Sequence, residues 1–161
     1  MEGLMADDTL STKHDMLVLE RLYQASPKRV FAAWSEPTIR KVWDVPGEGW
    51  ELTELEMDFR IGGREHSRFG PPGHPRYWSE GVYLDIVPNQ RIVSAGTMHD
   101  GDVRTAATLG TIELFSEDGR TRLRLTDQSV FLEGREDASD RKSGYGTVLD
   151  NLAAFLDAYP E

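Results

Sequence analysis

Apolar and polar residues alternate through most of the middle of this chain, which is the pattern of half-buried β-strands. In 51–60, for example, Leu55, Met57 and Phe59 alternate with acidic residues. Glycine and proline clusters interrupt the alternation, as at 62–63 and 70–75, and mark turns and loops. The pattern predicts seven strands, at 16–25, 51–60, 64–69, 77–87, 91–99, 106–115 and 121–131.

Three segments have helical signals instead. Ser26-Pro27 and Glu36-Pro37 each begin a short helix, because proline at the first helical position loses no useful hydrogen-bond donor. Near the end of the chain the apolar spacing changes to three and four residues, which predicts a long amphipathic helix capped by Asp137 or Ser139. Its apolar positions are Tyr145, Val148, Leu149, Leu152, Phe155, Leu156 and Tyr159.

The order of these elements predicts an α+β fold. Every link between successive later strands is short, so the sheet must be antiparallel. One face of this sheet is expected to be exposed to solvent, and the other to be covered by the long helix. The length of 161 residues predicts a single domain over 1–161, in which 1–13 form a loose N-terminal tail.

Composition and charge exclude several functions. Because 28 acidic residues outnumber 18 Lys and Arg, the net charge of −10 disfavours nucleic acids and anionic membranes as partners. The chain has no cysteine, which excludes disulfides and thiolate chemistry. It has neither an apolar run of about 18 residues nor the features of a signal peptide, so we expect a soluble cytoplasmic protein. The histidines lack metal-ligand spacing and no phosphate loop is present, so we expect no metal and no cofactor.

Several short motifs resemble one known family. The segment Val30-Phe31-Ala32-Ala33-Trp34-Ser35-Glu36-Pro37 is similar to the V-W-x-A-x-T-D-P segment of the SRPBCC superfamily. The segment 58–63 resembles its D-x-R-x-G-G hairpin, 81–88 its G-x-Y-x-E-I-x-P strand, and 119–123 its G-x-T-R-L strand start. Within that superfamily, 126–134 followed by 149–152 resembles homologues of the activator of heat-shock-protein-90 ATPase, C-terminal-domain type.

The resemblance, which covers about 17–156, implies a helix-grip fold: a curved antiparallel sheet of about seven strands wrapped around a long C-terminal helix, with a cavity between them. A bacterial branch of these activator homologues usually has glycine where this chain has Ser129, and tryptophan where it has Tyr145. Both positions are expected near the cavity, so the identity of a ligand does not transfer from the family.

Strand parity predicts where polar groups meet in that cavity. Leu123 and Leu125 face the helix, which places Asp127, Ser129 and Phe131 on the same face. The same parity argument predicts that Thr108 faces inward. It also predicts that Val82, Leu84 and Ile86 face inward, and Glu80 with them. Two carboxylates, Glu80 and Asp127, are therefore expected at one end of an apolar pocket, where burial would suit them to acid–base catalysis. The alternative is that each pairs with an arginine, such as Arg68, Arg76 or Arg104.

Aromatic residues supply the remaining candidate contacts. Trp43 and Trp50 flank the loop 44–49, beside the expected cavity entrance, and are either stacking surfaces for a ligand or simple packing residues. Tyr145 and Leu149 lie on the helix that forms the cavity wall. The hydroxyl of Tyr145 needs a partner if it is buried, which Asp127 or a ligand oxygen can supply.

We therefore expect a protein that binds a small apolar or amphipathic molecule between sheet and helix. An alternative is an enzyme of the polyketide cyclase/aromatase type, in which Glu80 or Asp127 moves protons while Tyr145 or Thr126 holds a carbonyl. A third possibility, suggested by the family's name alone, is a module that acts on a chaperone. A homodimer is the default expectation from base rates.

Overall fold

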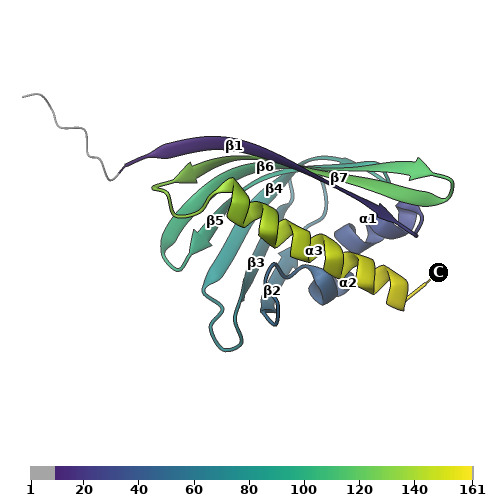
Figure 1. The fold of residues 1–161 in the computed structure, drawn as a ribbon, viewed down its shortest axis with the longest axis horizontal. Helices are drawn as coiled ribbons and strands as arrows, with labels where there is room; N and C mark the ends of the chain where they lie inside the picture. The colour runs from purple at the N-terminus through teal and green to yellow at the C-terminus, as the bar shows by residue number, and fades with distance from the viewer. Residues whose placement is uncertain (1–9, 161) are drawn as a thin grey trace, which may run out of the picture.

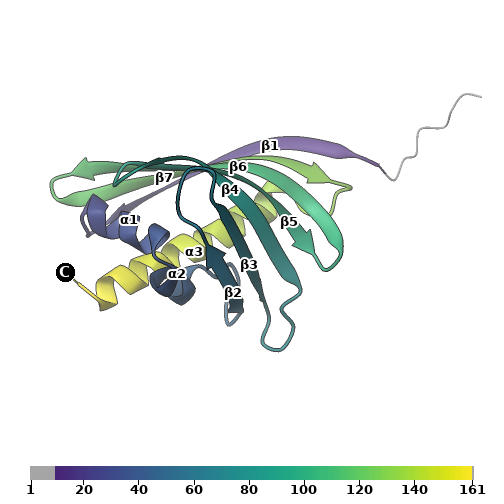
Figure 2. The ribbon, with the colours of Figure 1, turned by 180° about the vertical axis from the view of Figure 1, so that it is seen from behind.

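Residues 10–160, which the computed structural model describes, form one curved sheet and three helices. Neighbouring strands are antiparallel, in the order β1-β7-β6-β5-β4-β3-β2. Figure 1 shows α3 crossing the concave side of the sheet, and Figure 2 shows α1 and α2 beside the C-terminal half of α3. The elements are β1 Thr12–Tyr23, α1 Pro27–Ser35, α2 Pro37–Trp43, β2 Glu51–Met57, β3 Arg64–Gly70, β4 Tyr77–Val87, β5 Arg91–Asp100, β6 Val103–Glu117, β7 Arg120–Leu132 and α3 Ala138–Ala158.

This architecture confirms the predicted helix-grip α+β fold, and the predicted helix starts are confirmed in detail. The Ser26 side chain accepts a hydrogen bond from the Arg29 backbone N–H at the start of α1. At α3 the cap is Asp137 rather than Ser139. Asp137 and Asp140 form a reciprocal capping box, in which each carboxylate accepts from the other residue's backbone N–H.

The N-terminal part of the chain is more ordered than the sequence predicted. Thr12 and Lys13 were expected in a loose tail but belong to β1, where they pair with Leu132 and Phe131 of β7. Pairing with the end of β7 satisfies the backbone hydrogen-bonding groups of both strands. Residues 12–15 are all polar, so the alternation of apolar and polar residues could not predict this part of the strand. Residues 1–9 of the predicted tail lie outside the described residues.

The parity predicted for β4 is wrong in part. The pairing of β4 with β5 shifts between Tyr83 and Asp85, so Leu84 forms a bulge. Tyr83 is buried in the core, whereas Leu84, expected to face inward, is 48% exposed. Glu80 lies on the parity opposite to Tyr83 and is exposed.

The core occupies only part of the space under the sheet. On α3, Val148, Leu149, Leu152 and Leu156 are buried and pack against β6, β7, α1 and α2. The preceding turns of α3 contribute no buried apolar side chain. The C-terminal half of the helix is therefore fixed by apolar packing, and the N-terminal half is not.

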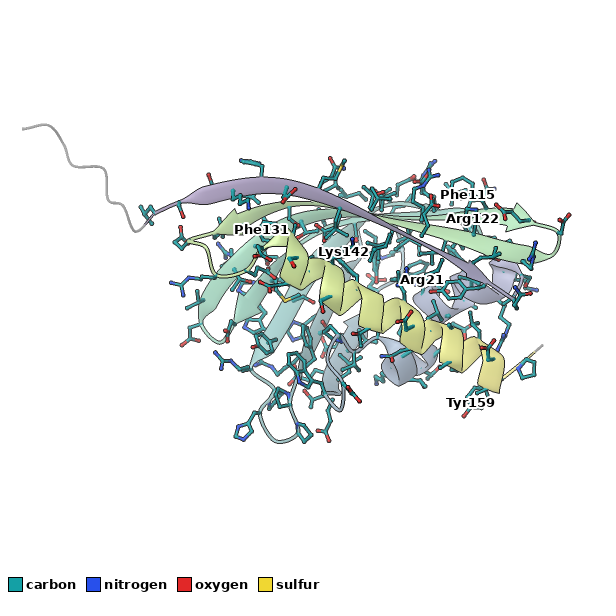
Figure 3. All side chains as sticks on the ribbon, viewed as in Figure 1. Arg21, Phe115, Arg122, Phe131, Lys142 and Tyr159 are labelled. Carbon is teal, nitrogen blue, oxygen red and sulfur yellow. The ribbon has the colours of Figure 1, made fainter. Side chains whose placement is uncertain are left out.

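The outer face of the sheet is mixed in polarity. In the rows that contain exposed apolar residues, a polar β7 residue lies between the β1 and β6 members: Arg122 separates Leu22 from Phe115, and Gln128 separates Met16 from Leu109. Figure 3 shows Phe115 and Arg122 on the side of the sheet away from α3. None of the helices in the described part of the chain combines the length and apolar character that a membrane crossing requires. The exposed apolar residues of β1 and β6 are Met16, Val18, Leu22, Leu109 and Phe115.

Candidate functional site

A cavity of about 680 Å³ lies between the concave face of the sheet and the N-terminal half of α3. Its volume falls in the range of pockets that enclose small molecules. The wall combines aromatic and aliphatic side chains with a few polar groups, and both helices and strands contribute to it. The apolar part of the wall includes Trp34, Trp50, Phe59, Phe69, Tyr77, Tyr83, Ile92, Met98, Ile112, Leu125 and Val148.

The cavity exists because small residues replace large ones on the concave face. Gly81 of β4 pairs directly with Gly96 of β5, and Ser94 of β5 pairs with Gly110 of β6. A Cβ atom on Gly96 would lie only 2.3 Å from the backbone oxygen of Glu80, so the two strands approach too closely for a side chain. Gly110 differs, because a Cβ atom there would meet nothing closer than the Ser94 hydroxyl at 3.8 Å. The cavity floor is therefore open at Gly110 because glycine has no side chain, although there is room for one.

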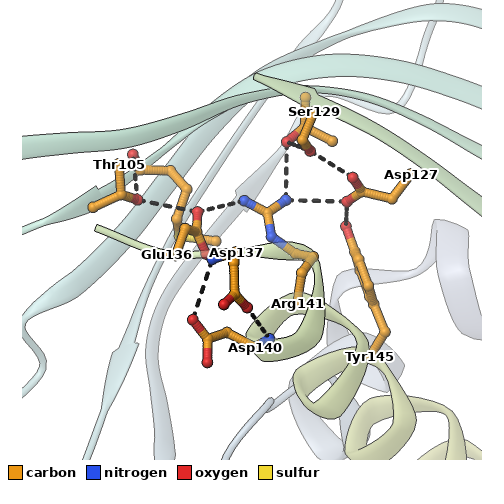
Figure 4. A network of polar contacts seen from close by, with 10 residues as sticks. Thr105, Asp127, Ser129, Glu136, Asp137, Asp140, Arg141 and Tyr145 are labelled. Carbon is orange, nitrogen blue, oxygen red and sulfur yellow. Dashed lines mark hydrogen bonds and ion pairs between the residues drawn. The ribbon is translucent and has the colours of Figure 1, made fainter. Parts of the chain in front are cut away.

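Arg141 forms the centre of a polar network at the α3 end of the cavity (Figure 4). It lies in the first turns of α3, and its side chain is only 9% exposed. Its Nη1 donates to Asp127 Oδ2 at 3.1 Å and to Thr108 Oγ1 at 2.9 Å. Its Nη2 donates to Glu136 Oε1 at 2.6 Å, an oxygen that also accepts from Thr105. One guanidinium therefore joins α3, β6, β7 and the loop before α3.

The hydroxyl groups of this network have a definite direction. Ser129 donates to Asp127 Oδ1 at 2.5 Å, so its own oxygen is free to accept from Thr108, 2.7 Å away. Thr108 can donate to it because the oxygen of Thr108 already accepts from Arg141. Tyr145 donates to Asp127 Oδ2 at 2.7 Å. Ser129, Tyr145 and Arg141 thus all donate to the carboxylate of Asp127, while Thr108 donates to Ser129.

Burial and charge set the protonation states here. Burial raises the pKa of Tyr145; Arg141 lowers it and Asp127 raises it further, so the hydroxyl stays protonated. Burial alone would lower the pKa of Arg141, but the neighbouring Tyr145, Glu136 and Asp127 raise it above its ordinary value. Arg141 is consequently a permanent cation between two carboxylates, Asp127 and Glu136.

A second arginine lies at the α2 end of the same cavity. Arg40, with a side chain 11% exposed, is paired both with Glu65 of β3 and with Asp44 at the end of α2. Its guanidinium carbon lies 6.0 Å from the ring centroid of Trp34, which places a cation over an aromatic face. All four residues line the cavity. This end therefore also consists of one guanidinium between two carboxylates, beside aromatic rings.

Three buried polar atoms within 10–160 have no hydrogen-bond partner. They are Nε1 of Trp34, the hydroxyl of Tyr83 and Nε of Arg141, and all three residues line the cavity. Buried polar groups are almost always paired in folded proteins. The three unpaired groups therefore gather around one cavity.

The two predicted carboxylates are not brought together. Asp127 is 1% exposed and, like Ser129, lies behind the cavity wall, where it is paired with Arg141 rather than with Arg68, Arg76 or Arg104. Glu80 belongs to the cavity rim but is exposed. Thr108 and Tyr145 line the cavity, and Thr126 does as well.

The aromatic candidates separate into two groups. Trp43 is 1% exposed in the core and donates its ring N–H to the backbone oxygen of Ala33. Leu149 and Phe131 are also buried behind the wall. Trp50, in contrast, lines the cavity and stacks on Tyr77, with ring centroids 5.2 Å apart and planes at 9°. Of the two tryptophans that the sequence singled out, only Trp50 lines the cavity, and its ring packs against Tyr77 and Gly47.

Sequence reasoning missed the two arginines at the centres of the clusters. Arg141 stands four residues before Tyr145, which is one helical turn on the same face. Arg40 stands four residues before Asp44 on α2 in the same way. The signal that could have identified each arginine is this spacing of four residues, to the expected cavity residue Tyr145 in one case and to the carboxylate of Asp44 in the other.

Comparisons with known proteins agree with this geometry. Residues 24–157 match the family described as Activator of Hsp90 ATPase homolog 1-like protein. The solved structure of an uncharacterised protein from Rhizobium leguminosarum has a TM-score of 0.86 and 37% identity, over 93% of this chain and 99% of that chain. The Mll3558 protein from Rhizobium loti has a TM-score of 0.81 and 39% identity, over 89% and 98%.

A more distant structure shares the fold. An AHSA1-like protein from Aeromonas hydrophila is 19% identical with a TM-score of 0.69, over 89% of this chain and 93% of that chain. No curated protein sequence matches the chain significantly. The similarity therefore defines a fold and a family, and the chemistry of the cavity has to be argued from the residues of this chain.

Proposed function

The chain belongs to the family of activator of Hsp90 ATPase homolog 1-like proteins, and from that premise we propose that it binds a small apolar or amphipathic molecule in the cavity between the sheet and α3. One observation carries this proposal: the N-terminal half of α3 lies over a hollow of about 680 Å³ instead of packing on the sheet. A hollow of this size in a folded interior forfeits packing energy, so its retention favours an occupant.

The lining supports an amphipathic ligand. Apolar residues from four elements line the cavity, among them Phe69 of β3, Ile112 of β6, Leu125 of β7 and Val148 of α3. Polar groups gather at the two ends, around Arg40 and Arg141. An apolar wall with a few convergent polar groups is the usual form of a small-molecule site.

Two rival functions receive less support. Acid–base catalysis of the cyclase type would need Glu80 and Asp127 free in the cavity, but Asp127 is held by Arg141, Ser129 and Tyr145, and Glu80 is exposed. Docking of a chaperone on the outer face would need a contiguous apolar patch. There the exposed apolar residues of β1 and β6 are separated by polar residues of β7.

The test uses the neutral fluorescent probe N-phenyl-1-naphthylamine with the purified chain. We expect saturable binding to the wild type, and in Gly110→Leu an affinity at least about tenfold lower, because the new side chain fills the floor of the cavity. Ser116→Leu is the matched control, since Ser116 lies on the same strand and is exposed. Native mass spectrometry of freshly purified protein shows directly whether a small molecule is carried along.

The outcomes are distinct. Equal probe affinity in Gly110→Leu and the wild type, with both proteins folded by circular dichroism, contradicts the cavity as the site. A wild type that binds no apolar probe and retains no small molecule contradicts the proposal altogether.

A further inference from the structure

The two arginine clusters of the cavity wall share an unbalanced charge. At each end one guanidinium lies between two carboxylates: Arg40 between Asp44 and Glu65, and Arg141 between Asp127 and Glu136. Each cluster therefore has a net charge of −1 in a partly enclosed place. An uncompensated charge away from water is unfavourable, and a cation brought beside it removes the imbalance.

The carboxylate oxygens point to the same conclusion. Glu65 contacts Arg40 through Oε1, Asp44 contacts it through Oδ2, and Glu136 contacts Arg141 through Oε1. Within 10–160, no donor contacts the other oxygen of any of these three groups. Their side chains are 22%, 23% and 19% exposed and line the cavity. An ionised carboxylate only accepts hydrogen bonds, so the wall offers acceptors to an incoming ligand.

The α2 end adds the aromatic groups that a cation prefers. Trp34, Phe59 and Tyr83 line the cavity there, with the rings of Phe59 and Tyr83 4.9 Å apart. The ring of Trp34 already faces the cation of Arg40. Tyr83 is 3% exposed, and its hydroxyl, which makes no hydrogen bond, lies beside the charges of Arg40 and Asp44. Aromatic rings combined with carboxylates are a recurring arrangement for ammonium groups.

We propose that the ligand is a cationic amphipath, an apolar body with a protonated amine, and that the amine binds at the α2 end of the cavity. This inference rests on the proposed function. The ammonium lies among the free oxygens of Glu65 and Asp44, beside the Trp34 and Phe59 rings. The same charges exclude fatty acids and other anionic amphipaths, although such molecules would fit the apolar middle of the cavity.

The test compares three ligands that share one apolar body and differ in charge: 4-phenylbutylamine, 4-phenylbutan-1-ol and 4-phenylbutanoate. Each displaces N-phenyl-1-naphthylamine from the wild type at pH 7. We expect the amine to bind about tenfold more tightly than the alcohol. A charge-assisted hydrogen bond is about twice as strong as a neutral one, and the difference corresponds to roughly tenfold in affinity. The carboxylate is expected to bind most weakly.

Glu65→Gln locates the effect. It leaves Arg40 paired with Asp44 alone, so the cluster becomes neutral, and we expect the preference for amine over alcohol to fall to about threefold or less. The affinity for the alcohol should not change. Asp157→Asn removes the same charge from the exposed surface of α3 and should preserve the preference.

Failure of this inference differs from failure of the proposed function. If the alcohol binds and the amine binds no better, the cavity holds a ligand but not a cationic one. If Glu65→Gln keeps the full preference, the amine does not bind at the α2 end. If neither the alcohol nor the neutral probe binds, the proposed function itself is wrong.

Discussion

Individual charged residues determine the character of the cavity more than its shape does. Arg141 and Asp127 form an ion pair in which the side chains are 9% and 2% exposed. Such pairs contribute little net stability, because desolvation offsets the attraction, but removing one partner leaves a buried charge. The pair instead fixes position: it joins the first turns of α3 to β7, where the helix has few apolar contacts.

Tyr145 tests that role. In Tyr145→Phe the donor to Asp127 Oδ2 is lost, and we expect the free energy of unfolding at pH 7 to fall by about 1–2 kcal/mol. Urea unfolding measures the change. Tyr159→Phe, at the C-cap of the same helix and 63% exposed, is the control and should have no effect.

The same pair of proteins has a defined pH dependence. Burial, helped by Asp127 and opposed by Arg141, raises the pKa of Tyr145 in the folded chain. The unfolded phenol ionises near pH 10 while the folded one does not, so the stability due to Tyr145 is complete below about pH 10 and is lost above it. The difference between the wild type and Tyr145→Phe should therefore shrink between pH 9 and pH 11. A difference that grows with pH contradicts this assignment.

At the scale of elements, the sequence was most informative where its pattern was most regular. The bounds of β4 agree with prediction, as do the proline-started helices α1 and α2. The bulge at Leu84 was not predictable, because a register shift is decided by pairing with β5 and leaves no local signal. Because of that single shift, Glu80 points outward instead of into the cavity, and the expected pair of carboxylates does not form.

The candidate site was predictable only in part, for a similar reason. Strand parity and helix spacing are local rules, and they brought Asp127, Thr108 and Tyr145 together as neighbours, which the structure joins in one polar network. Arg141 and Arg40 were missed because an arginine on a helix is usually solvated, and nothing local distinguishes one that the fold buries.

Two glycines show how differently elements tolerate a side chain. Gly146 lies inside α3, where a Cβ atom would meet nothing closer than the Arg21 guanidinium at 3.9 Å. Gly146→Ala should therefore stabilise the protein by up to about 1 kcal/mol and raise the melting temperature by about 3 °C. Gly63 follows β2 in a turn, where a Cβ atom would lie 1.9 Å from the Asp58 backbone oxygen, so Gly63→Ala should destabilise by at least about 2 kcal/mol. If calorimetry finds Gly63→Ala to be more stable than Gly146→Ala, the turn geometry at Gly63 is contradicted.

At the scale of the whole molecule, the protein combines a solid half with a hollow half. The solid half contains Leu149, Leu152 and Leu156 of α3, with the helices α1 and α2 packed beside them. The hollow half lies under 138–147, where Arg141 and Tyr145 make polar contacts and only the Tyr145 ring reaches the apolar core. Local opening in proteins is easiest where few apolar contacts must be broken. We therefore expect local opening to cost less free energy in the N-terminal half of α3 than in its C-terminal half.

Hydrogen exchange tests this division of α3. Backbone amides of 142–147 should exchange faster than those of 149–156, because opening the first segment breaks the contacts of Arg141 and Tyr145 but leaves the core intact. A neutral apolar ligand should slow exchange in 142–147 and leave 149–156 unchanged, since it contacts only the part of the helix over the cavity. In Gly110→Leu the gradient should persist without ligand, while the effect of the ligand disappears. Equal protection along the whole helix would mean that α3 opens as one unit, and a ligand would then have to enter by another part of the wall.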